Sequence, residues 1–168
     1  MPQDAPVITV HSLAQAVAAL KAAAGTGVAI TLASAPEAGI SAGPGWWRAL
    51  VEMARKAVPA AEFSTLLDCG AEPGAALAAI RAQVEAIVFT GRADVAGRLA
   101  DVARQHGVRL VTTQPTPILD LGAAFFAASE HIERRCLQLL AQPGFRRAPA
   151  AAGETGSGGT PACRSAED

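Results

Sequence analysis

The sequence predicts an α/β domain with a parallel sheet of about five strands, each followed by a helix. Short runs of β-branched and apolar residues alternate with longer runs whose apolar residues recur at helical spacing. Hydrophobic residues make up 51% of the 168 residues, which is enough to bury both faces of such a sheet.

The expected strands are short, apolar runs bounded by glycine, proline or polar residues. Such strands, separated by helices, favour parallel pairing because the connecting helices cover the sheet. The expected strands are residues 7–10, 28–33, 63–67, 86–89 and 108–111.

The segments between these strands have amphipathic patterns that predict helices. Ser12 can cap the first helix, and Gly25 or Gly27 can end it, because glycine adopts the left-handed conformation common at helix ends. Pro73 suits the first turn of the third helix. The expected helices are residues 13–24, 46–57, 73–84 and 94–106.

After residue 111 the alternation stops. Residues 114–117 predict a turn or an extended linker, and the spacing of apolar residues over 123–141 predicts one long helix. From Pro143 onward the chain is rich in glycine, alanine and proline, which predicts a disordered tail over 143–168. We therefore expect one α/β domain, residues 1–142, followed by that tail.

Charge and cysteine content indicate which partners and which cellular compartment to expect. A net charge of −1 offers no general field for nucleic acid or an anionic membrane, so neither is an expected partner. The N-terminus lacks the pattern of a secretion signal, and no apolar run approaches the roughly 18–20 residues that span a bilayer. Three widely spaced cysteines fit free thiols in a reducing compartment, and we expect a cytoplasmic protein.

The end of the third strand carries a resemblance to a known family. Residues 66–70, Leu-Leu-Asp-Cys-Gly, resemble the His-Leu-Asp-His-Gly that ends the third strand of class II (metal-dependent) ketose-bisphosphate aldolases. Residues 9–16, 30–34 and 79–91 are similar to neighbouring family segments in the same order, so the resemblance covers 7–111. It implies an aldolase-type partial (β/α) barrel. A doubly wound, flavodoxin-like sheet stays open as the alternative, because strand–helix alternation suits both.

The departures from the family pattern decide what the resemblance implies for chemistry. Cys69 replaces the zinc-ligand histidine, residues 111–114 carry no carboxylate, and the segments with two further histidines and the phosphate-binding loops have no match. A catalytic zinc typically needs three protein ligands. We therefore expect no metal and no cofactor. Asp68 matches the family's proton-transfer aspartate and is the expected catalytic residue.

Parallel α/β sheets hold their functional groups at the carboxyl ends of the strands. Besides Asp68, this edge is expected to carry the candidate binding residues His11, Ser34, Cys69, Thr90 and Arg92, and also Gln114. Simpler roles stay open as well. Asp68 can cap a helix or bind loop amides, Cys69 can be a buried apolar residue, and Arg92 can be solvated. A Cys69–His11 dyad is chemically possible but rests on no motif.

Three functions remain open. The first is a degenerate aldolase-like protein without the zinc site, acting in binding or regulation rather than catalysis. The second is a lyase or isomerase that uses Asp68 on a small phosphorylated or carboxylated metabolite. The third is a flavodoxin-like signalling or nucleotide-binding domain. We expect a homo-oligomer, since sheet edges need cover. Of Trp46 and Trp47, one is expected in the core and the other at a partner interface.

Overall fold

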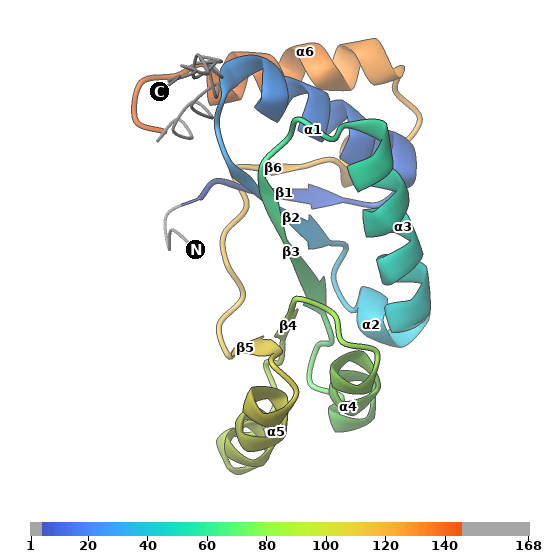
Figure 1. The fold of residues 1–168 in the computed structure, drawn as a ribbon, viewed down its shortest axis with the longest axis vertical. Helices are drawn as coiled ribbons and strands as arrows, with labels where there is room; N and C mark the ends of the chain where they lie inside the picture. The colour runs from blue at the N-terminus through green and yellow to red at the C-terminus, as the bar shows by residue number, and fades with distance from the viewer. Residues whose placement is uncertain (1–4, 146–168) are drawn as a thin grey trace, which may run out of the picture.

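The computed structural model describes residues 5–145 and contains one parallel six-stranded sheet, in the order β5-β4-β3-β2-β1-β6 (Figure 1). The strands are β1 (Val7–Val10), β2 (Ile30–Ser34), β3 (Phe63–Asp68), β4 (Ala86–Val88), β5 (Arg109–Val111) and β6 (Leu119–Asp120). The first five strands lie side by side in chain order. This order confirms the partial barrel and excludes the flavodoxin-like sheet, whose first two strands exchange places.

Each of the first four strands leads to a helix. The helices are α1 (Leu13–Thr26), α2 (Ala38–Ser41), α3 (Gly43–Ala57), α4 (Pro73–Arg81), α5 (Ala93–Gln105) and α6 (Ser129–Leu140), with a 3-10 turn, η1, at Gly122–Ala124. Ser12 caps α1 by accepting a hydrogen bond from the Gln15 amide, and Gly27 ends it at φ 66°, as predicted. The segment between β2 and the predicted helix 46–57 contains α2, and α3 begins at Gly43 rather than at residue 46, because Pro44 fits a first turn.

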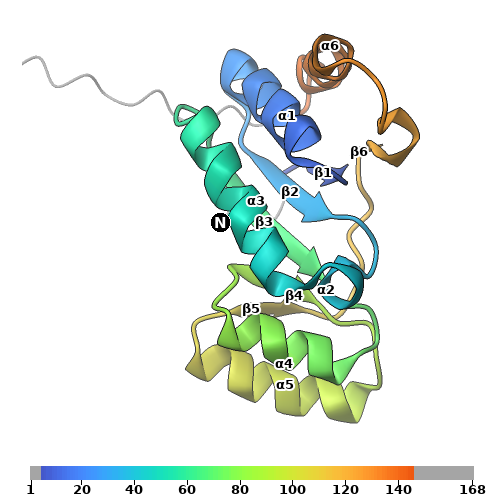
Figure 2. The same ribbon diagram turned by 90° about the vertical axis from the view of Figure 1, so that its right-hand side faces the viewer.

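The two faces of the sheet are covered differently. Leu32 and Ile87 belong to the large apolar cluster that includes the buried residues of the helices. Ala33 and Val88, one position further along the same strands, belong to a small second cluster made of strand residues. In Figure 2, α3 lies in front of the strands, and α4 and α5 lie below β4 and β5. The link between β5 and β6 runs along the side away from α3 (Figure 1).

The prediction of one helix over 123–141 is wrong in its first part. Residues 119–120 form β6, which pairs in parallel with β1 through Ile8↔Leu119 and Thr9↔Asp120, and α6 begins only at Ser129. Within 123–128 the structure has the end of the 3-10 turn η1 followed by turns, and Phe126 is 98% exposed, so this stretch has no apolar helix face to bury. Just before it, Leu119 is buried while Asp120 is exposed, which is the alternation of a strand.

The edge of the sheet at β1 is covered by β6 and not by the C-terminal helix. The amides of Ile118 and Leu121 donate to the carbonyls of Val7 and Thr9 at 2.8 and 3.0 Å. Helix α6 instead packs on α1 (Figure 1) and buries Ile132, Cys136 and Leu140.

Of the predicted tail, Phe145 is partly buried against the main cluster, and residues 146–168 lie outside the described residues. Within residues 5–145, no helix is both long and apolar enough to cross a membrane.

Candidate functional site

Asp68 ends β3 and is held in place by two neighbouring segments. Its side chain is buried, and Oδ1 accepts a hydrogen bond from the Gly70 amide at 2.7 Å. Its own amide donates to Ser34 Oγ on β2 at 2.9 Å. No described residue donates to Oδ2. Asp68 therefore binds a loop amide. It is not the capping residue of α4, because the residue that precedes this helix is Glu72.

Cys69 is turned into the helix-covered side of the sheet. It is fully buried, and it lies so close to Gly39 of α2 that a Cβ there would approach its sulfur to 2.9 Å. Burial, with a smaller effect of the Asp68 carboxylate, raises the pKa of the Cys69 thiol to about 12. Cys69 is thus a buried apolar residue that stays protonated at neutral pH, and no contact joins it to His11.

We predict that Cys69 and Cys136 resist alkylation in the folded protein. Both are buried, and burial raises the pKa of Cys136 to about 11. Because the thiolate is the reactive form, iodoacetamide at pH 8 should label neither residue until urea unfolds the chain. Peptide mass spectrometry separates them from Cys163. Labelling of Cys69 in folded protein, at the rate of a free thiol, would contradict this placement.

A second polar contact at this edge joins His11, which follows β1, to Asp120 on β6. His11 Nε2 lies 2.7 Å from Asp120 Oδ1, across 109 residues of sequence. The same oxygen accepts the Gly122 amide at 2.8 Å. A Cβ at Gly122 would lie 2.9 Å from His11 Nε2, so any larger residue here would require the imidazole to shift away from its position against Asp120.

A glutamine connects the two turns that carry this pair. The amide of His11 donates to Gln15 Oε1 at 2.7 Å, and Gln15 Nε2 donates to the Leu121 carbonyl at 2.9 Å. Gln15 is buried, so both groups of its amide are satisfied out of water. The sequence prediction included His11 but missed Asp120. A usable signal was present, because Asp120-Leu121-Gly122 repeats the Asp-x-Gly pattern of Asp68-Cys69-Gly70 with the same turn.

The stability that Asp120 contributes is expected to depend on pH. Partial burial opposes its ionisation, but the Gly122 amide and His11 outweigh burial and lower the pKa of the carboxyl. A lowered folded-state pKa stabilises the fold above the unfolded pKa of about 3.9, and this stability is lost as pH falls through the folded value. Asp120→Asn should cost at most about 1 kcal/mol at pH 7, because the pair is half exposed.

Thermal unfolding of the wild type and Asp120→Asn at several pH values checks this linkage. The difference in Tm should be present at pH 7 and shrink as pH falls below the unfolded pKa of about 3.9 and through the lowered folded-state pKa, because the carboxyl then becomes protonated in both states. An equal difference at both pH values would mean that the charge of Asp120 is irrelevant.

The remaining predicted residues are not brought together with Asp68 or His11. Thr90 is exposed, and its backbone amide donates to the Gly70 carbonyl at 2.8 Å. The side chain of Arg92 is 81% exposed and makes a two-point ion pair with Asp94, at 3.0 and 3.1 Å. Gln114 is exposed on the link to β6. The edge therefore holds two separate polar groups, Ser34–Asp68 and His11–Asp120.

Two cavities adjoin these groups. One, of about 500 Å³, lies beside the Gly70 turn and is lined by Glu37, Ile40 and Glu72 among others. The other, of about 290 Å³, is lined by His11 and Ser12 and by the exposed side chains of Trp46 and Met53. Trp46 is thus a partly exposed surface residue, while Trp47 lies in the core.

The donor set does not fit the zinc site of the resembled family. Among residues 5–145, no three His, Cys, Asp or Glu side chains converge as a metal site requires. Cys69, at the position of the family's ligand, is protonated and turned away into the core.

Comparison with known proteins gives a similarity of fold. No family model matches the chain, and no curated protein matches its sequence. A solved structure described as a "putative fructose-1,6-biphosphate aldolase" from Coccidioides immitis is similar, with a TM-score of 0.51 and 20% sequence identity. The match covers 63% of this chain and 39% of that one. The chain therefore has an aldolase-like α/β fold and spans well under half the length of that protein.

Proposed function

We propose that the chain is a degenerate relative of the class II aldolases that binds or regulates without a zinc site. The main observation that supports this proposal concerns Cys69. It stands where the family has a ligand histidine, yet it is fully buried and its thiol pKa is raised to about 12. Asp68 is oriented by the Gly70 amide at Oδ1, and its part in proton transfer is tested separately below.

The 500 Å³ cavity beside the Gly70 turn is the proposed binding site for a small metabolite. Glu37 and Glu72 line it, so a ligand with hydroxyl donors suits it better than a small phosphorylated metabolite does. Self-association also remains a proposal. Strand β5 is an edge strand of three residues, which a second copy could cover.

Metal binding and turnover test the proposal directly. Chelator-stripped protein is titrated with zinc by calorimetry and assayed for cleavage of fructose 1,6-bisphosphate. We expect neither stoichiometric zinc binding nor turnover, with or without added zinc. Stoichiometric zinc binding that Cys69→Ser abolishes would overturn the proposal, as would turnover that Asp68→Asn abolishes.

A thermal-shift screen with small polyols and sugars tests the binding role. Hits should disappear in Glu37→Gln and Glu72→Gln but persist in Glu130→Gln, a control carboxylate on α6. Hits that all three variants retain would place the ligand elsewhere.

The His11–Asp120 pair supports a second candidate, an enzyme of the lyase or isomerase class. A carboxylate that accepts from one ring nitrogen orients the imidazole and leaves the other nitrogen as a base. That base would border the 290 Å³ cavity. In this case, turnover of a small carboxylated metabolite should fall at least about 100-fold in His11→Gln. Turnover lost in Asp68→Asn but retained in His11→Gln would instead identify Asp68 as the base.

A further inference from the structure

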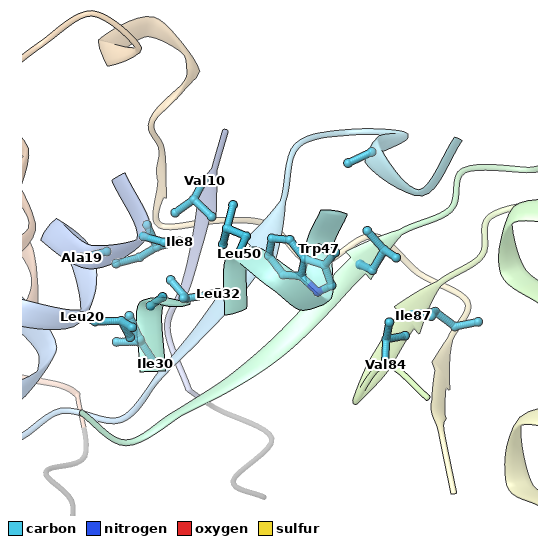
Figure 3. Packing of buried hydrophobic residues seen from close by; sticks show 14 of the residues in the cluster. Ile8, Val10, Ala19, Leu20, Ile30, Leu32, Trp47, Leu50, Val84 and Ile87 are labelled. Atoms are coloured by element: carbon cyan, nitrogen blue, oxygen red, sulfur yellow. The ribbon is translucent and has the colours of Figure 1, made fainter. Parts of the chain in front are cut away.

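A third cavity, of about 300 Å³, lies away from the carboxyl edge, between α3 and the connection that leads from α4 to β4. It opens where β3 and β4 separate, because their pairing begins only at Leu67↔Ile87. Trp47 of α3 lines it, and Figure 3 shows this indole with Leu50 on one side and Val84 and Ile87 on the other. The cavity is therefore built on the core of the domain.

The indole of Trp47 has an unused hydrogen-bond donor at this cavity. Trp47 is 1% exposed, and its Nε1–H has no acceptor. Within residues 5–145, no other side-chain nitrogen or oxygen is both fully buried and without a partner. Buried donors are ordinarily paired, since an unpaired one loses its hydration without compensation. An oxygen acceptor at the cavity would remove this defect.

Two arginines line the same cavity. Arg48 and Arg55 are seven residues apart on α3, so they lie on one face of the helix, about two turns apart. Neither forms an ion pair with a carboxylate of the described chain. Arg55 instead places its guanidinium over the ring of Phe63, 4.6 Å from the centroid. Both guanidinium groups therefore retain N–H donors that can bind an anion.

The carboxylates at the cavity are already engaged. Glu85 Oε2 accepts from the amide and hydroxyl of Thr65, both at 3.0 Å, where β3 is not paired with β4. Glu52 accepts from Lys56 at 2.6 Å. The donors left free at the cavity are an indole N–H and two guanidinium groups, and each of the two carboxylates already has one oxygen engaged.

We propose that this cavity binds a small oxyanion, a carboxylate or a phosphate. Arg48 and Arg55 hold its charge, and one oxygen accepts the Trp47 N–H once the side chains that bury this nitrogen move aside. The site shares no residue with the carboxyl-edge cavities, so it stands independently of the proposed function.

The indole signal of Trp47 provides the test. In Trp46→Phe protein Trp47 is the only tryptophan, and ¹⁵N labelling gives one indole N–H resonance to follow. Sodium succinate and sodium phosphate are titrated separately against sodium chloride at equal ionic strength. We expect one of the two anions to shift this resonance saturably while chloride does not, and the anion that does so identifies the ligand class.

Arginine variants separate a specific site from general attraction. Arg48→Gln and Arg55→Gln should each weaken binding roughly tenfold or more, as expected for the loss of a charge-assisted hydrogen bond. Arg98→Gln, an exposed arginine on α5, should leave the affinity unchanged. The proposal is wrong if neither anion shifts the indole resonance beyond chloride, or if the shift survives in the Arg48→Gln/Arg55→Gln double variant.

Discussion

Trp47→Ala is expected to lower the free energy of unfolding by about 3–5 kcal/mol, the usual cost of truncating a buried aromatic side chain. Trp47 is among the largest fully buried side chains and fills the space between α3 and the sheet. Its neighbour Trp46 is the matched control, because it is 37% exposed and borders an open cavity. Trp46→Ala should cost much less, about 1 kcal/mol.

Urea unfolding of the two alanine variants, followed by circular dichroism, measures both values. Trp47→Phe adds a third comparison, because it keeps an aromatic ring and removes the unpaired N–H. It should cost less than about 1.5 kcal/mol, well below Trp47→Ala. Equal destabilisation by Trp46→Ala and Trp47→Ala would contradict the burial of Trp47.

Gly39→Ala is expected to destabilise the fold by about 1–3 kcal/mol through overpacking. A Cβ at Gly39 would lie 2.9 Å from the carbonyl oxygen of Asp68 and 3.2 Å from Cys69 Cα. These are backbone atoms at the end of β3 and cannot rotate away. Either α2 or the Asp68 turn has to move, so the change also disturbs the edge cavity that Gly39 lines.

Gly97→Ala is the control for this substitution. Gly97 lies within α5, and nothing is within 4 Å of a Cβ built there. The helix propensity of alanine should then stabilise the protein by about 0.5–1 kcal/mol. Opposite signs for the two substitutions, from the same urea measurement, are the expected result. A neutral Gly39→Ala would show that α2 is free to shift.

Much of the fold was predictable because each early strand has its own local signal. Residues 7–10 and 63–67 are apolar runs flanked by turn residues, and their observed bounds differ from the prediction by at most one residue. The order of the first five strands followed from the colinear resemblance. Strand β6 has only two residues and pairs with β1 across the chain, so no local pattern could identify its partner.

The candidate site was predictable in part. Topology places Ser34 and Asp68 on adjacent strand ends, and the structure joins them by a hydrogen bond. The pairing of His11 with Asp120 depends on where β6 lies, which the sequence pattern did not reveal. The unpaired N–H of Trp47 depends on how β3 and β4 separate. The spacing of apolar residues in the sequence does not reveal such a feature of three-dimensional packing.

The placement of β6 has a consequence for how the chain folds. Pairing of neighbouring strands among β1 to β5 closes only a short loop of chain. The β1–β6 pairing closes a loop of about a hundred residues, so its entropic cost is greater. We therefore expect β1 to β5 to form first and β6 to dock late. Substitutions at Leu121 or Asp120 should then speed unfolding while leaving the folding rate almost unchanged. Strand β6 would then be the last strand to join the sheet during folding and the first to leave it during unfolding.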